Sequence, residues 1–180
     1  MTWFDHIDDD RKAFIERQQM FFVATAPSDS DEGFPNLSPK GRSLLRVLAP
    51  NLVGYLDYPG SGNETARHTD ENGRITLMLC SFERAAGILR LYGRGRHVDL
   101  ADPQLRQYKD AFASDVHPYV RQAFFVDVEK VQTSCGYAVP RLDYVADRDT
   151  LDKYCARGFE PREMVDGLPA AGPLREKAQR

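Results

Sequence analysis

The sequence predicts a mainly β fold of the all-β or α+β class, with one antiparallel sheet closed as a barrel. Strand-like runs follow one another closely along the chain, and only short helical segments interrupt them. The regular alternation of strands and helices that a parallel sheet needs is missing. The length of 180 residues is enough for a single domain with a sizeable core.

The strands are predicted from apolar runs that polar, Gly- and Pro-containing segments separate. The clearest are 74–82 and 87–98. In the first of these, Ile75, Leu77 and Leu79 alternate with Thr76, Met78 and Cys80, so both faces should be buried. The other predicted strands are 20–26, one that starts at Asn36, 43–48, 52–58 and 124–131.

Short helices are expected around the sheet. The first covers 11–18 and is capped by the aspartates at 8–10, and the second covers 63–71 and ends at Asn72-Gly73. A third begins at Asp102-Pro103, because Asp can cap a helix and Pro suits its first turn. Its apolar stripe would be Leu105, Tyr108 and Phe112.

The chain divides into a barrel domain over 1–135, which includes the N-terminal helix, and a C-terminal extension over 136–180. Asp147 can cap one helix of the extension, which carries Leu151 and Tyr154. Beyond Phe159 the chain has little core-forming material, so we expect a mobile tail.

Composition argues against several function classes. The net charge of −3 and the pI near 5.8 lack the basic field typical of nucleic-acid binding. The acidic start has no apolar run for a signal peptide or a membrane span, so we expect a cytoplasmic protein. The cysteines at 80, 135 and 155 are far apart, which argues against a disulfide framework and a zinc site. We expect no metal.

The segment Gly60-Ser61-Gly62-Asn63-Glu64-Thr65 follows a strand and opens a helix. Backbone N–H groups and the helix dipole favour an anion there. It approaches the dinucleotide fingerprint G-x-G-x-x-G, but the flanking strands do not form the required βαβ unit, and it is not a Walker A loop. The alternative is an ordinary strand-to-helix turn capped by Ser61 or Asn63.

Two further segments favour a ligand site. Ser38, Lys40 and Gly41 lie at the end of a strand and could form a second wall for an anionic ligand, unless they are simply a polar hairpin end. Tyr92 and Arg94 share one face of their strand with Arg90 and Arg96, which could instead be a solvated basic face.

Taken together, 36–41, 56–68, Asn72-Gly73-Arg74 and 89–98 resemble the pyridoxamine 5′-phosphate oxidase-like, FMN-binding split-barrel family. The resemblance covers about Phe14 to Ser134. It is strongest to a branch, distinct from the true pyridoxamine 5′-phosphate oxidases, that continues with Ser134-Cys135-Gly136-Tyr137. It implies a six-stranded split barrel that forms a homodimer, with FMN in two clefts between the subunits.

The resemblance also implies roles for individual residues. The helix after Gly62 would face the FMN phosphate, where the wider family often has Ser-Arg-Lys and this chain has Asn63, Glu64 and Thr65. Backbone N–H groups, Thr65, Ser61 and Lys40 or Arg67 would replace the missing basic residues. His68 would be a structural residue or a neighbour of the flavin or phosphate. Tyr92 and Arg94 would come from the neighbouring subunit.

The function implied is an FMN-dependent oxidoreductase that acts on a small molecule, with hydride or electron transfer at the flavin. No catalytic acid or base is assigned. The C-terminal substrate motif of the true oxidases has no counterpart around 140–172, so vitamin B6 oxidation is not assigned. The alternatives are a flavin- or haem-binding protein without turnover, or a reductase that uses the deazaflavin F420.

Overall fold

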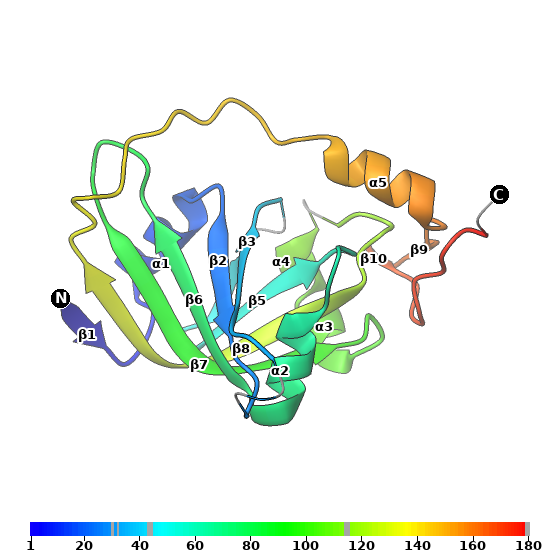
Figure 1. Ribbon diagram of the computed structural model, residues 1–180, viewed down its shortest axis with the longest axis horizontal. Coiled ribbons are helices and arrows are strands. Elements are labelled where there is room, and N and C mark those ends of the chain that lie inside the picture. Colours follow the sequence, from blue (N-terminus) through cyan, green and yellow to red (C-terminus); the bar gives the residue numbers. More distant parts are fainter. Residues whose placement is uncertain (30, 32, 43–44, 114–115, 179–180) are drawn as a thin grey trace.

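The fold is built on a single large antiparallel sheet. The computed structural model of the protein describes residues 1–29, 31, 33–42, 45–113 and 116–178. Eight strands form the sheet in the order β3-β2-β6-β7-β8-β5-β4, and β1 pairs with residues 131–133 of β8 (Figure 1). The strands are β1 Thr2–Phe4, β2 Phe21–Thr25, β3 Asn36–Lys40, β4 Arg46–Ala49, β5 Leu52–Asp57, β6 Arg74–Cys80, β7 Ile88–Val98 and β8 Gln122–Ser134.

Short helices surround this sheet, as the sequence predicted. They are α1 Asp9–Arg17, α2 Glu64–Asn72, α3 Pro103–Gln107, α4 Lys109–Phe112 and α5 Thr150–Gly158. The Asp8 side chain caps α1, and Asp102 caps α3. The third predicted helix divides into α3 and α4 at Tyr108. α5 starts after Asp149, two residues later than the predicted cap.

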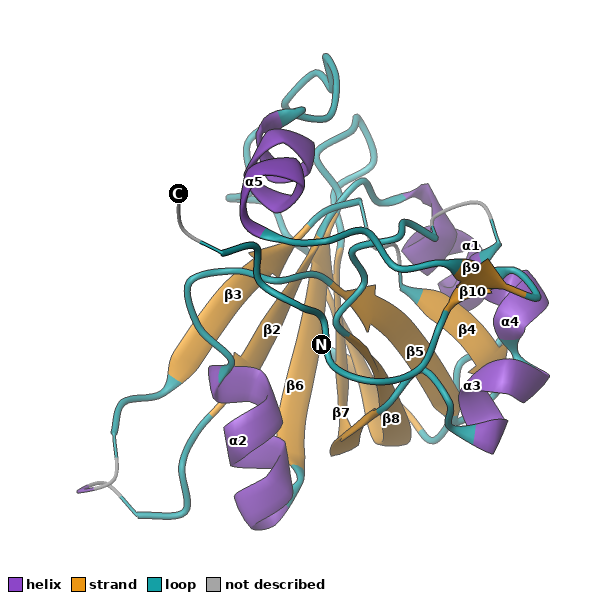
Figure 2. Ribbon diagram, turned by 90° about the vertical axis from the view of Figure 1, so that its right-hand side faces the viewer, coloured by secondary structure: helices purple, strands orange, loops and turns teal. Residues whose placement is uncertain are grey.

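Apolar side chains form two clusters, one on each face of the sheet. The first contains Ile15 of α1 and Ala66 of α2 with inward side chains of the strands. The second lies between β5, β8 and the helices α3 and α4, and includes Leu56 and Phe125. Strand β5 is therefore buried on both faces, and α2 lies at one end of the sheet (Figure 2). This arrangement places the turn after β5 beside the N-terminus of α2.

The prediction of a closed, six-stranded barrel was wrong. In the described part of the chain, β3 and β4 end the strand order and share no backbone pairing, and the sheet has eight strands. Pro39 has no N–H to donate, which suits β3 to a free edge. β4 is short, and its pairing with β5 shifts register between Val47 and Ala49. The predicted strand 43–48 begins at residues 43 and 44, which lie outside the described residues.

A bulge shapes the middle of the sheet where β7 meets β8. The pairing shifts between Tyr92 and Gly93, so that Glu129 of β8 has no opposite residue. Any side chain at position 93 would collide with the backbone carbonyl of Asp127. Glycine is therefore required at this point for the two strands to approach.

The C-terminal extension packs back onto the domain. β9 Met164–Val165 and β10 Leu168–Pro169 form a small hairpin, and the Arg162 N–H donates to the Pro118 carbonyl at 3.1 Å. Leu168 is fully buried in the second apolar cluster, so the segment beyond Phe159 contributes a core residue that the sequence analysis missed. The domain boundary at residues 135 and 136 stays a prediction.

Candidate functional site

The turn between β5 and α2 joins the end of a strand to the start of a helix, at the place that the sequence predicted. Residues 60–62 connect the strand to the helix, and Asn63 is the N-cap residue of α2 but makes no side-chain bond to the first turn. Gly73 ends the helix in the left-handed conformation, with a φ of 69°. The Glu64 carboxylate folds back against Gly62, where a Cβ would collide with it. A negative group thus already lies beside the N-terminus of α2.

Asp57, the last residue of β5, is the centre of the charged network at this turn. Its carboxylate is only 2% exposed and accepts from Lys40 Nζ at 2.8 Å, Arg121 Nη2 at 2.7 Å and Gln122 Nε2 at 3.0 Å. Gln122 also donates to Asn63 Oδ1 at 2.8 Å, which links the network to α2. Two cations share one carboxylate, so these side chains carry an excess positive charge.

The network also bridges the gap in the sheet. Lys40 ends β3 and Asp57 ends β5, and these strands have no backbone pairing in the described residues. The Lys40–Asp57 ion pair therefore connects two parts of the sheet that the backbone leaves apart. Tyr55, also on β5, is fully buried. Burial and the Asp57 charge raise its pKa well above 10.0, so its phenol stays neutral.

A second network joins β2, β3 and α2 through uncharged side chains, with the Arg67 guanidinium at its edge. The fully buried His68 ring shares a hydrogen bond of 3.0 Å with Thr25 Oγ1 through Nδ1. Arg67 Nη2 lies 3.3 Å from His68 Nε2, and a guanidinium can only donate, so Nδ1 carries the proton. Asn36 donates to Thr65 Oγ1 at 3.1 Å, and Ser38 donates to Asn36 Oδ1 at 2.8 Å.

The structure thus brings most of the predicted site residues together in two adjoining groups. Lys40 and Asn63 belong to the Asp57 network, and Ser38, Thr65 and His68 belong to the uncharged one. Both ring nitrogens of His68 are occupied, which suits a positioning role. The exposed Ser61 and the Gly60–Gly62 backbone border the first group, with Glu64 beside them. Gly41 is exposed beyond the end of β3.

Tyr92 and Arg94 lie elsewhere in the same chain. Their side chains point away from the first apolar cluster, since Leu89 and Leu91 on the alternate positions are buried in it. Tyr92 donates to Gln132 at 3.3 Å. Arg94 donates to the Asn72 carbonyl at 2.8 Å and pairs with Glu129. Both line a pocket of about 520 Å³ that reaches the uncharged network only at Thr25 and Asn36.

Sequence reasoning missed Asp57, Arg121 and Gln122. One signal was available for Asp57, because a carboxylate at the end of an otherwise apolar strand needs buried partners. No local pattern marks Arg121, which lies 64 positions further along the chain. Its contact with the turn depends on the antiparallel pairing of β5 with β8, in which Asp57 lies opposite Gln122.

Two features are absent from the part of the chain that the structure describes, a membrane-spanning helix and a cluster of metal-binding side chains. No helix there is long and apolar enough to cross a membrane. Among the same residues, no group of three or more His, Cys, Asp or Glu side chains could hold a metal ion.

Comparisons with known proteins give consistent results. The family model for pyridoxamine 5′-phosphate oxidase matches residues 7–135. The pyridoxamine 5′-phosphate oxidase family protein ustO of Aspergillus flavus is 37% identical over 176 residues, which cover 97% of this chain and 67% of that protein.

Two solved structures are similar in fold. HupZ of Group A Streptococcus has a TM-score of 0.57 at 19% identity, over 76% of this chain and 99% of that one. A haem-binding protein from Mycobacterium smegmatis has a TM-score of 0.50 at 16% identity, over 70% of this chain and 52% of that one. At these identities the similarity extends to the fold alone.

Proposed function

Because this chain belongs to the pyridoxamine 5′-phosphate oxidase family, we propose that it binds FMN and acts as a flavin-dependent oxidoreductase on a small molecule. The observation that carries the proposal is the charge at the turn after β5. There Lys40 and Arg121 share the single buried carboxylate of Asp57, next to the N-terminus of α2. A phosphate dianion would complete this arrangement.

The residues present fit a phosphate group, although the Arg and Lys common in the family are missing. Lys40 and Arg121 keep about a quarter of their side-chain surface exposed, so both can reach a ligand while bonded to Asp57. The Asn63 side chain leaves the first turn of α2 without a cap. Glu64 opposes the phosphate, so its carboxylate has to move away from Gly62 when the cofactor binds.

The chemistry would come from the cofactor and its placement from the chain. Bound FMN supplies hydride or electron transfer at its ring. The Asp57 network would bind the phosphate end. The uncharged network around His68 would hold α2 against β2 and β3, because its hydrogen bonds join all three elements. None of these side chains needs to act as an acid or base.

The proposal includes a homodimer with the cofactor between two subunits. Tyr92 and Arg94 lie on the opposite face of the sheet from Lys40, so one chain does not bring them to the phosphate end. A second copy could supply them. This face also has apolar surface for such a contact, provided by the half-exposed Trp3 and the exposed Leu37. The ring centroids of Trp3 and Tyr92 are 5.6 Å apart.

The test compares FMN with riboflavin, which lacks the phosphate. Lys40→Met should weaken FMN binding by about 10- to 100-fold, the value of one charge-assisted contact, and leave riboflavin binding unchanged. Lys12→Met is the matched control, because Lys12 is an exposed lysine on α1. Flavin fluorescence titration gives both affinities. Equal losses for the two flavins, or an unaffected FMN affinity, would place the phosphate away from Lys40.

Haem binding without turnover is the second candidate, favoured by the fold shared with the Mycobacterium smegmatis protein. His68 is a poor axial ligand because both its ring nitrogens are already bonded, which leaves His6, His97 and His117. A reductase that uses the deazaflavin F420 is the third candidate. The visible spectrum of the purified protein separates these cofactors, since a haem gives a dominant Soret band and a flavin gives two weaker bands.

A further inference from the structure

A cavity next to the turn is built partly by the C-terminal extension. It encloses about 470 Å³ between the end of β7, the start of β8 and the extension. Gly60 and Arg121 border it on one side, and Phe159, Arg162 and Leu174 on the other. Its volume is within the range of small-molecule sites. The cofactor proposed above gives this space no role.

Arg162, at the wall of this cavity, is a cation that has no ion-pair partner in the part of the chain that the structure describes. Its Nη2 donates to the Gly172 carbonyl at 2.6 Å, while Nε and Nη1 are buried and have no hydrogen-bond partner among the described residues. None of the ion pairs among the described residues includes Arg162, although Asp99 is near enough to act on it electrostatically. Burial lowers the pKa of Arg162. A buried guanidinium with two unfilled donors favours an anion beside it.

The other residues at the cavity wall indicate what a ligand would carry besides its negative charge. Arg121 adds positive charge, and its bonds to the Gly62 carbonyl are long, at 3.3 and 3.4 Å. Tyr154 and Phe159 both border the cavity and form an edge-to-face pair with ring centroids 5.9 Å apart. Glu176 also borders the cavity but is exposed, and Asp99 already accepts from the Ala101 N–H at 2.8 Å.

We propose that this cavity binds a small aromatic carboxylate, with the acid group on Arg162 and the ring against Phe159 and Tyr154. The Gly172 carbonyl covers the guanidinium, so the ligand carboxylate would take over the bond to Nη2 and fill one of the two empty donors, Nε or Nη1, beside it. A planar guanidinium matches a carboxylate in this two-bond geometry. The site does not depend on flavin, because none of its contacts requires the cofactor.

The test uses benzoate as the probe and benzamide as its uncharged counterpart, with the full chain and no flavin. Binding is followed by two-dimensional NMR of backbone amides and Arg Nε–H groups. Benzoate should bind and shift the signals of Gly60, Arg162 and Gly172, and benzamide should bind at least about tenfold more weakly.

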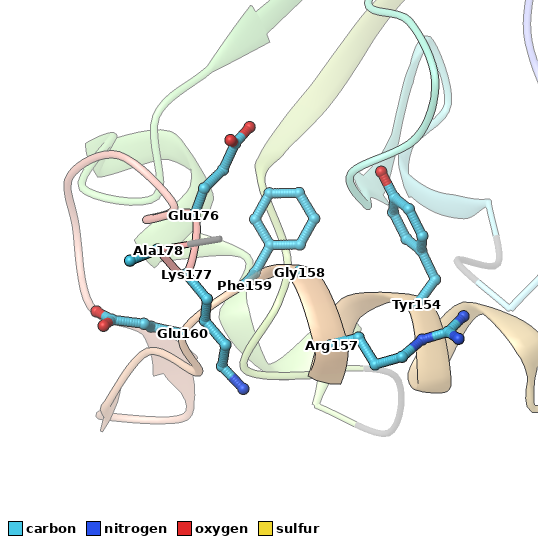
Figure 3. Close-up of a pocket in the computed structure, with 8 residues that line it drawn as sticks. All are labelled: Tyr154, Arg157, Gly158, Phe159, Glu160, Glu176, Lys177 and Ala178. Carbon is cyan, nitrogen blue, oxygen red and sulfur yellow. The ribbon is translucent and has the colours of Figure 1, made fainter. Parts of the chain in front are cut away.

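The variants locate the site on Arg162. Arg162→Met should weaken benzoate binding about tenfold or more, and Arg162→Lys, which keeps the charge but not the fork, should give an intermediate loss. Arg157→Met is the control. Arg157 is an exposed arginine on α5 that borders the neighbouring pocket of about 830 Å³ and extends away from Phe159 (Figure 3). It should change benzoate affinity less than about twofold, as expected of an exposed charge outside the site.

Three results would overturn the proposal: equal affinity for benzoate and benzamide, unchanged affinity in folded Arg162→Met, or no benzoate binding at all. Thermal unfolding checks that each variant is folded. If Arg162→Met does not fold, the benzoate affinity of Arg162→Lys is the test. Wild-type affinity in that variant would contradict the two-bond geometry. A chain that binds benzoate but no flavin would refute the proposed function and leave this site standing.

Discussion

Replacing Asp57 by Asn should destabilise the fold, because the carboxylate joins β3 to the paired strands β5 and β8, with which β3 has no backbone pairing among the described residues. Asn keeps the size of the side chain but removes the charge that Lys40 and Arg121 share at 2.8 and 2.7 Å. A hydrogen bond to a charged group contributes about 1 kcal/mol more than a neutral one, and two such bonds are affected. Both cations regain some water because each is about a quarter exposed.

The expected loss is therefore about 2–3 kcal/mol in the free energy of unfolding, less than the 3–5 kcal/mol typical of a fully buried broken pair. For a chain of this size that corresponds to about 4–12 °C in Tm. Urea unfolding gives the free energy and calorimetry the Tm. Asp149→Asn is the control, since the Asp149–Lys153 pair is exposed and its loss should not be measurable.

A double-mutant cycle makes the test specific to the network. Once Asp57 is neutral, Lys40 is an unpaired cation, so Lys40→Met should cost less in the Asp57→Asn background than in the wild type. A coupling below about 0.5 kcal/mol, or a loss for Asp57→Asn below about 1 kcal/mol, would refute the view that this carboxylate holds the open sheet together.

Two further predictions concern the helices α2 and α5. Glu64→Gln should raise FMN affinity about two- to fivefold, because it removes a negative group from the N-terminus of α2. A fluorescence titration measures this affinity, and Glu16→Gln is the control variant. The Arg42 guanidinium, which hydrogen-bonds the Asp152 carboxylate at 2.7 Å, lowers the pKa of Asp152 below its ordinary value of 3.8. That ion pair therefore supports α5 fully above pH 3.8 and is lost as the pH falls through the lowered value. Hydrogen exchange corrected for intrinsic rates should show α5 losing protection below pH 3.8, and Asp152→Asn should remove this step; an unchanged profile in the variant would contradict it.

Local patterns in the sequence were enough for most of the elements. Alternation of apolar residues located β6 and β7, and capping chemistry located α1, α2 and α3. The short strand β1 was missed, because three residues carry too little periodicity and its pairing partner lies in β8. Barrel closure was also predicted wrongly, since no local pattern states which distant edge strands meet.

For the candidate site, the sequence by itself determined the turn between β5 and α2, the hydroxyl and lysine side chains of β3, and the family. Those features depend on neighbours along the chain, which a sequence displays directly. Only the tertiary structure decided that Asp57 neutralises Lys40, that Arg121 reaches the same turn, and that Arg162 borders a cavity with no ion-pair partner among the described residues. Electrostatic pairing depends on distance in space, and the folded sheet alone brings these residues within reach.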